Sequence, residues 1–215
     1  MLRAILFDLD GTLIDTMDLI VACWQHATTV HCGAPVARER VLPTIGLPLV
    51  PALEEYAPGL GEALYATYTE HNLEWHDRLA RLVPGTVEML TTLRQAGIAC
   101  GLVTSKRHVT LQMGLDLHGL TPYFDTIVGF EDSERHKPLP DPALVAAARL
   151  GVAPDPAAVA YVGDATSDMA CAVAAGVRPV GVPWGAAPVE DLRAAGADPV
   201  LTSWDDLIAL ALAPA

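Results

Sequence analysis

The amino-acid sequence predicts an α/β fold: a doubly wound, Rossmann-like parallel sheet with an all-helical cap inserted after the first strand. Short apolar runs alternate with helical patterns through the second half of the chain, which is typical of a parallel sheet covered on both faces. The first apolar run, Ala4 to Phe7, is separated from the next, Ile98 to Val103, by far more than the roughly dozen residues that a crossover needs. A separate folded unit is therefore expected in this interval.

After Pro84 the expected elements follow one another in regular order. Glycines stand where helices need a C-terminal stop, at Gly97, Gly151, Gly176 and Gly196. Strands are predicted over residues 98–103, 126–130, 159–162 and 179–182. Helices are predicted over residues 86–95, 108–118, 142–150 and 168–175, with a last helix after Ser203.

The long interval itself carries helical signals. Apolar side chains recur at the spacing of one helix face, in the groups Leu19, Ile20, Cys23, Trp24, Ala27 and Leu64, Tyr65, Tyr68, Asn72. Prolines are expected to divide the segment into several short helices, at Pro43, Pro48, Pro51 and Pro58. We predict a cap domain over residues 15–81 and a core domain formed by residues 1–14 and 82–215.

Composition restricts the class of protein. Hydrophobic residues make up 52% of the 215 residues and charged residues 18%, so a sizeable core is expected. The net charge of −13 argues against a nucleic-acid partner, because such proteins carry basic patches. The longest apolar runs, such as Leu207 to Ala213, are too short to span a membrane, and the first residues do not resemble a signal peptide. We expect a soluble cytoplasmic protein, a monomer or a homodimer, with a small-molecule substrate.

The cysteines and histidines do not form a recognisable metal motif. The four cysteines lack C-x-x-C spacing, and three of them lie in apolar surroundings typical of buried, reduced thiols. The seven histidines are scattered along the chain. A zinc site is therefore not expected.

Two carboxylates follow the first strand at a spacing of two residues. In the segment Asp8-Leu9-Asp10-Gly11-Thr12, the alternation of a strand points Asp8 and Asp10 the same way. An ionised carboxylate can attack phosphorus to give an aspartyl phosphate, and a second carboxyl group can protonate the leaving oxygen. Two like charges this close require a cation, and Mg²⁺ is the usual one with hard oxygen ligands. An ordinary acidic turn is the alternative for this motif taken alone.

Polar residues are also expected at the carboxyl ends of other strands, where ligands bind in such sheets. Thr104 and Ser105 are predicted to bind phosphate, through a hydroxyl and through backbone amides at a helix start. Lys137 adds a charge that can bind phosphate and keep Asp8 ionised. Asp164 would complete the Mg²⁺ shell with Asp8 and the Asp10 carbonyl, and Asp168 would bind the ion or a water molecule held by it.

Each of these residues also has an ordinary structural explanation. Thr104 and Ser105 could cap a helix, and Lys137 could be a solvated surface lysine. Asp164 and Asp168 could be first-turn acids favoured by a helix dipole. The four groups together, in this order at one edge of one sheet, instead match the needs of phosphoryl transfer.

These motifs resemble those of the haloacid dehalogenase superfamily of phosphatases. The resemblance spans the chain and rests on Asp8-x-Asp10-Gly11-Thr12, Thr104-Ser105, Lys137-Pro138-x-Pro140 and Gly163-Asp164-x-x-x-Asp168. It implies Asp8 as nucleophile, Asp10 as general acid and then base, Thr104 and Lys137 as phosphate-binding residues, and Mg²⁺ held at Asp8, Asp10 and Asp164. Asp10 argues against carbon–halogen cleavage, because dehalogenases of this superfamily lack the second aspartate. The helical insert resembles the cap of the phosphoglycolate phosphatase-like branch.

Within that branch, two stretches are most similar to the superfamily's inorganic pyrophosphatases, Arg40 to Leu49 and Val103 to Leu115. The segment from Tyr68 to Asp77 is similar as well, although Trp75 stands where another histidine is expected. Phosphoglycolate phosphatases share the style of the cap loop, so a phosphoglycolate or other small phosphomonoester substrate is the alternative. A non-catalytic phosphoacceptor module is a third hypothesis, which the cap disfavours.

Pyrophosphate differs from phosphoglycolate in needing cationic groups for its second phosphoryl group. The sequence offers five candidates, none of which it singles out: Lys106, Arg107, Arg38, Arg40 and Arg78.

Overall fold

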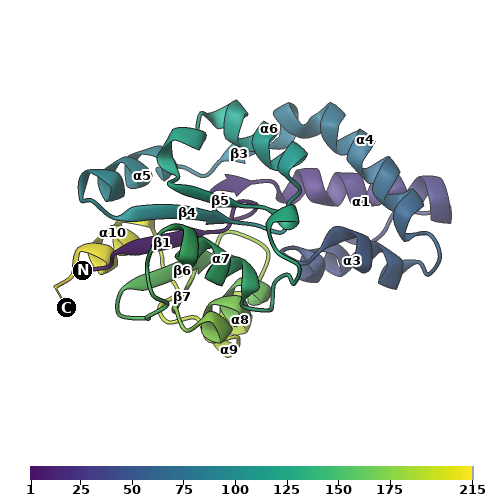
Figure 1. Cartoon of the computed structure of the whole chain (residues 1–215). Helices are drawn as coiled ribbons and strands as arrows, with labels where there is room; N and C mark the ends of the chain where they lie inside the picture. Colours follow the sequence, from purple (N-terminus) through teal and green to yellow (C-terminus); the bar gives the residue numbers. More distant parts are fainter. Residues whose placement is uncertain (215) are drawn as a thin grey trace.

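The fold is built on a five-stranded parallel sheet, seen in a computed structural model that describes residues 1–214 (Figure 1). The strand order is β5-β4-β1-β6-β7. The strands are β1 (Ala4–Phe7), β4 (Ala99–Val103), β5 (Thr126–Val128), β6 (Val159–Gly163) and β7 (Arg178–Gly181). Strand β1 is therefore central, with β4 and β6 on either side, and all of its residues are buried.

The two faces of the sheet carry different packing clusters. Ile5 and Phe7 belong to the larger cluster and Ala4 and Leu6 to the smaller one, as the alternation of strand side chains requires. Helices α7 and α8 contact one face, and α5, which packs against α10, contacts the other. Figure 1 shows α5 and α6 on one side of the sheet and α7, α8 and α9 on the opposite side. The helices of the core are α5 (Thr86–Gln95), α6 (His108–His118), α7 (Asp141–Arg149), α8 (Thr166–Ala175), α9 (Val189–Ala194) and α10 (Trp204–Leu212).

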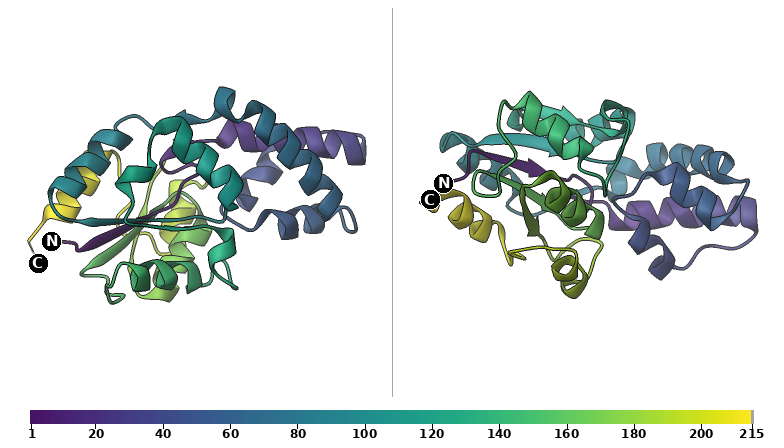
Figure 2. Two further views of the ribbon diagram at one scale, coloured as in Figure 1. Left: turned by 45° about the horizontal axis from the view of Figure 1, so that its top comes forward. Right: turned by 60° about the horizontal axis from the view of Figure 1, so that its bottom comes forward.

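The residues between the first strand and α5 form a group of helices that extends away from the sheet, which we call the helical insertion (Figure 2). Its elements are α1 (Met17–Cys32), α2 (Arg38–Val41), η1 (Leu42–Thr44), α3 (Leu49–Tyr56) and α4 (Gly61–Leu79). Helices α1 and α4 pack along each other, and α3 packs on α4. A two-stranded antiparallel ribbon, β2 (Ile14–Asp15) with β3 (Arg81–Leu82), joins the insertion to the core.

The predicted α/β fold with a parallel sheet is confirmed, and most predicted elements lie within two residues of their observed bounds. The strand predicted over 126–130 is shorter, because a 3₁₀ turn, η3 (Phe130–Asp132), follows β5. Helix α8 begins at Thr166 rather than at residue 168, since the Asp168 carboxylate accepts a hydrogen bond from the backbone N–H of Ala165 and so stabilises the first turn.

Two predictions about helices were wrong. The insertion does not consist of short helices only, because α1 has 16 residues and α4 has 19. Pro51 does not break a helix: it lies in the first turn of α3, where a missing N–H costs no hydrogen bond. Helix α9 was not predicted at all, although Gly196 was identified as a stop signal and does follow this helix.

The prediction of three buried thiols is confirmed. Cys23, Cys100 and Cys171 are buried, Cys32 is exposed, and all four cysteines are free. Within residues 1–214, the helices are too short or too polar to cross a membrane.

The thiols are expected to differ in reactivity. Burial raises the pKa of Cys23 and of Cys100 to about 12 and that of Cys171 to about 11, whereas Cys32 is exposed. Because the thiolate is the reactive form, DTNB should label one thiol rapidly in the native protein, and Cys32→Ser should abolish that fast phase. All four thiols should react after unfolding in guanidinium. A second fast phase in native Cys32→Ser would contradict the packing described.

Candidate active site

The carboxyl ends of the three central strands bring the predicted site residues together. Asp8 follows β1, Thr104 follows β4 and Asp164 follows β6. Because β4 and β6 are the two hydrogen-bonded neighbours of β1, these side chains emerge beside one another. All three residues are buried.

Three carboxylates form the centre of the site. Single oxygen atoms of Asp8, Asp164 and Asp168 all lie within 4.8 Å of one another. All three side chains are buried, so their charges are poorly screened by water. Three buried carboxylates this close together suit a hard divalent cation, which takes oxygen ligands and would offset the mutual repulsion.

Lys137 provides the positive charge beside these carboxylates. Its Nζ atom lies 2.6 Å from Oδ1 of Asp168 and 3.0 Å from Oδ1 of Asp8, and its side chain is 1% exposed. Burial alone would lower the pKa of Lys137, but the charges of Asp168 and Asp8 outweigh it, so the pKa is raised. Lys137 therefore stays protonated. It comes from the segment between η3 and α7, far along the chain from Asp8.

The surroundings of Asp8 and Asp164 disfavour the ionised form of both carboxyl groups. Burial raises the pKa of Asp8 to about 7, against the opposing effect of Lys137. Burial, followed by the charges of Asp168 and Asp8, raises the pKa of Asp164 well above its usual value. An additional positive charge would therefore be needed to keep both acids ionised at neutral pH.

Each oxygen of the Asp164 carboxylate accepts a hydrogen bond from a neighbouring segment. Oδ1 accepts a hydrogen bond from the hydroxyl of Thr12 (2.8 Å), and Oδ2 accepts one from the backbone N–H of Ala186 (2.8 Å). A Cβ atom at Gly11 or at Gly185 would collide with this carboxylate. Glycine at both positions thus lets the main chain close around Asp164.

Asp10 has a different set of partners. Its Oδ1 accepts hydrogen bonds from Nζ of Lys106 and from the hydroxyl of Thr16, both at 2.8 Å. Asp10 is not one of the three carboxylates whose oxygens lie within 4.8 Å of one another. The prediction that Asp10 binds the metal concerned its backbone carbonyl and stays a prediction.

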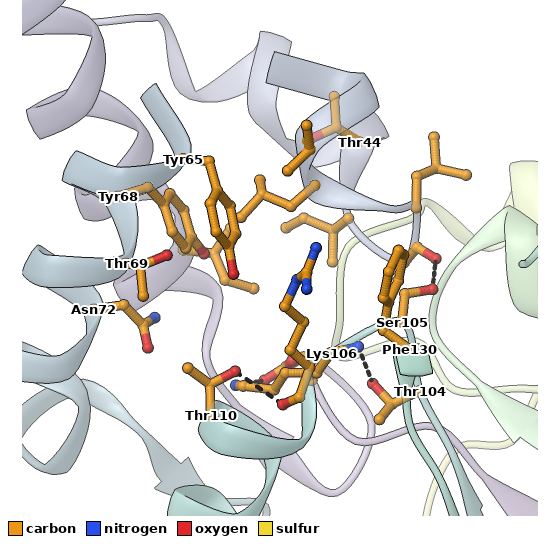
Figure 3. Close-up of a pocket in the computed structure, with 18 of the residues that line it drawn as sticks. Thr44, Tyr65, Tyr68, Thr69, Asn72, Thr104, Ser105, Lys106, Thr110 and Phe130 are labelled. Carbon is orange, nitrogen blue, oxygen red and sulfur yellow. Dashed lines mark hydrogen bonds and ion pairs between the residues drawn. The ribbon is translucent and has the colours of Figure 1, made fainter. Parts of the chain in front are cut away.

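A cavity of about 120 Å³ lies between the helical insertion and the core. Asp8, Asp10 and Thr104 line its core side together with Lys106. Figure 3 shows Tyr65, Tyr68 and Asn72 of α4 on one side and Thr104, Ser105 and Phe130 on the other. More of the wall is apolar than polar, with Trp24, Leu49 and Val50 among the apolar residues.

Ser105 connects the core to the insertion. Its hydroxyl donates a hydrogen bond of 2.8 Å to the backbone oxygen of Gly46, in the loop between η1 and α3 (Figure 3). The hydroxyl of Thr104 accepts a hydrogen bond from the backbone N–H of Lys106 at 3.2 Å. Both residues line the cavity, as a phosphate-binding role requires.

Sequence reasoning missed several residues of the site. Thr12 and Ala186 hold Asp164, while Thr16 holds Asp10. Thr12 stood inside the first motif, so its hydroxyl was a visible signal. Ala186 contributes only its backbone, for which a sequence offers no signal.

The five basic residues considered for binding a second phosphoryl group differ in their position relative to the cavity. Lys106 and Arg107 line the cavity. Arg38 pairs with Asp18 at the surface, and the guanidinium groups of Arg40 and Arg78 lie over aromatic rings of the insertion. These three arginines are not among the residues that line the cavity.

Comparison with known proteins agrees with this geometry. A model of the family described as haloacid dehalogenase-like hydrolase matches residues 5–182. Pyrophosphatase PpaX of Bacillus velezensis is 38% identical over 95% of this chain and 94% of its own length. Pyrophosphatase PpaX of Bacillus pumilus is 35% identical over 97% of this chain and 96% of its own length. A hydrolase of known structure from Pseudomonas syringae is 28% identical, with a TM-score of 0.86 and coverage of 96% of both chains.

The enclosure of Asp164 can be tested with a matched pair of glycine variants. Gly11 and Gly33 have nearly the same backbone φ, +79° and +81°, but a Cβ at Gly33 meets nothing within 4 Å. Gly33→Ala should cost about 1–2 kcal/mol for the left-handed backbone alone. Gly11→Ala should cost about 1–3 kcal/mol more, because it also displaces a buried carboxylate. Denaturant unfolding measures both, and equal losses would show that Asp164 has room to move.

Proposed function

Because the chain belongs to the haloacid dehalogenase-like hydrolases, we propose that it is a Mg²⁺-dependent phosphohydrolase that cleaves inorganic pyrophosphate through an aspartyl phosphate on Asp8. The observation that carries this proposal is the buried group of Asp8, Asp164 and Asp168 around Lys137, with Asp10 beside it at the base of a cavity. Such a group can hold a cation and a phosphoryl group against one nucleophilic oxygen. The PpaX relatives are named pyrophosphatases, which supports pyrophosphate as the substrate.

In the first step, a carboxylate oxygen of Asp8 attacks one phosphorus atom of pyrophosphate. The new bond joins this oxygen to phosphorus, and the bond from phosphorus to the bridging oxygen breaks. The bridging oxygen leaves with the electron pair and takes a proton from Asp10, so that the first phosphate departs. Asp10 lines the cavity with Asp8 and has one oxygen, Oδ2, outside the hydrogen bonds to Lys106 and Thr16.

In the second step, water attacks the phosphorus of the aspartyl phosphate. Asp10, now ionised, accepts the proton of this water molecule. The bond between phosphorus and the Asp8 oxygen breaks, which releases the second phosphate and restores the Asp8 carboxylate.

Thr104, Ser105 and Lys137 would bind the phosphoryl group during both steps. Thr104 lines the cavity and offers a hydroxyl, and Ser105 offers a backbone N–H in the segment that precedes α6. Lys137 contributes a buried charge next to Asp8. Hydrogen-bond donors fixed in advance around the equatorial oxygens stabilise the charge of the transition state.

The residues that would hold Mg²⁺ are Asp8 and Asp164, with the Asp10 carbonyl as a third ligand. Asp168 has both oxygens engaged, by Lys137 and by the backbone N–H of Ala165, so we assign it to positioning Lys137 and the ion's water shell. A bound Mg²⁺ neutralises charge on the phosphoryl oxygens and helps to align the reacting groups.

We propose that residues 15–81 act as a cap over this site. The helices of this segment form one wall of the cavity, and their closure would exclude water from it, as lids commonly do.

A small phosphomonoester such as 2-phosphoglycolate is the second candidate substrate. The cavity wall combines apolar side chains with the hydroxyl groups of Tyr65 and Thr69, which are hydrogen-bond donors for the carboxylate of such a substrate.

The proposed nucleophile is tested by comparing pyrophosphate, 2-phosphoglycolate and a sugar phosphate by kcat/KM with Mg²⁺ present. Pyrophosphate should rank first for the wild-type protein. Asp8→Asn should reduce turnover of every substrate by at least about a thousandfold, since the amide cannot form the intermediate. Activity in Asp8→Asn close to that of the wild type, or pyrophosphate among the poorest substrates, would refute the proposal.

Mg²⁺ binding is expected to depend on pH in a defined direction. The folded pKa of Asp8 is raised to about 7, above an unfolded value of about 3.9, so its burial costs increasing stability as the pH rises from about 4 to 7. A bound Mg²⁺ ion would reduce this loss of stability only at a pH at which Asp8 is ionised. Mg²⁺ at about 100 times its Kd at pH 8 should raise Tm by about 5 °C or more at that pH. The same Mg²⁺ concentration should raise Tm by less at pH 6.

Asp164→Asn is the control variant for this measurement, because it removes one proposed ligand while keeping the side-chain shape. It should show little Mg²⁺-dependent shift at either pH. A wild-type shift equal at pH 6 and pH 8 would contradict binding at these carboxylates.

A further inference from the structure

The position of Lys106 relative to Asp10 bears on how the leaving group is held, given the proposed function. Asp10 must reach the bridging oxygen in order to protonate it, so the leaving phosphate must lie next to Asp10. Nζ of Lys106 lies 2.8 Å from Oδ1 of Asp10. A charged ammonium group is therefore within a short distance of the place where negative charge develops on the leaving group.

Lys106 is also directed into the site. Its side chain is only 11% exposed, and the residue lines the cavity together with Asp8 and Asp10. Figure 3 shows Lys106 between the side of the cavity formed by Tyr65, Tyr68 and Asn72 and the side formed by Thr104 and Ser105.

Arg107 extends this positive charge outward. Its guanidinium lies 5.3 Å from the ring centre of Tyr65, on α4, and 4.8 Å from that of Phe130, in the core. It thus spans the cavity from the core to the insertion. Its NH1 atom lies 3.9 Å from Oε1 of Glu131, at the outer limit of an ion pair, so this carboxylate does not form a close hydrogen bond with it.

The site carries more negative than positive charge, so an anionic leaving group needs the positive charges of Lys106 and Arg107. Asp8, Asp10, Asp164 and Asp168 are four acids, and Lys137 is already engaged by two of them. The arginines of the insertion considered from the sequence, Arg38, Arg40 and Arg78, do not line the cavity. Among the residues that line it, Lys106 and Arg107 are the basic ones.

We propose that Lys106 and Arg107 bind the leaving phosphoryl group of the substrate and select for a doubly phosphorylated compound. On binding, the leaving phosphate shares the Lys106 ammonium with Asp10. The selection for a second phosphoryl group then resides in the segment that follows β4 of the core, because the cavity-lining residues of the insertion carry no positive charge.

The test uses two variants that keep the length of the side chain and remove its charge, Lys106→Met and Arg107→Met. Calorimetry measures the Kd of methylenediphosphonate, which carries two phosphoryl-like groups, and of methylphosphonate, which carries one. Kinetics measures kcat/KM for pyrophosphate and for phenyl phosphate, whose leaving group has an apolar ring in place of the second phosphoryl group. Arg38→Met, which removes a surface arginine of the insertion, is the matched control.

Each site variant should weaken binding of the diphosphonate about 10- to 100-fold, the range for losing a charged hydrogen bond, and should affect methylphosphonate much less. The ratio of kcat/KM for pyrophosphate to that for phenyl phosphate should fall by a similar factor. Arg38→Met should leave both ligands unchanged.

Equal weakening of both ligands would overturn the proposal, because Lys106 would then act only by holding Asp10. Unchanged binding of the diphosphonate in both site variants, or the same loss in Arg38→Met, would also overturn it. A wild-type protein that turns over phenyl phosphate but not pyrophosphate would refute the proposed function, while the binding measurements would still decide this inference.

Discussion

The buried ammonium group of Lys137, held between Asp8 and Asp168, is the interaction on which the site depends. Charges removed from water in this way cost several kcal/mol each, and well-packed apolar residues are often equally or more stabilising. The triad is therefore explained better by chemistry than by stability. Lys137 connects Asp8, which follows β1, to Asp168, which lies in the first turn of α8. It therefore holds the two carboxylates at a fixed separation beside the place where a cation and a phosphoryl group would bind.

Parallel strands explain why so much of the site could be predicted. Asp8, Thr104 and Asp164 each follow a buried apolar run, and the carboxyl ends of such runs meet at one edge of a sheet. Their proximity therefore followed from the fold class, before any distance was known. Lys137 was harder to place from local pattern, because it lies in an irregular segment whose path depends on tertiary packing. Its assignment rested on the family resemblance as much as on chemistry.

The features that could not be predicted involve contacts that leave no local signal. The pairing of Asp10 with Lys106 joins residues far apart in the chain, and the Ala186 N–H that holds Asp164 belongs to the backbone. Helix α9 is only six residues long, too short for a clear helical period. The lengths of α1 and α4 were underestimated because the prolines are confined to the segment between them, where they shape the connections rather than the two long helices.

The two-stranded ribbon of β2 and β3 is the place where the chain leaves the core and returns to it. Ile14 pairs with Leu82 and Asp15 with Arg81, so the outgoing and incoming strands lie side by side. An excursion of more than sixty residues thus begins and ends at nearly one point, and the sheet keeps the same order whatever is placed beyond it. The length and sequence of the segment beyond this junction can therefore change without moving the strand ends that carry Asp8, Thr104 and Asp164.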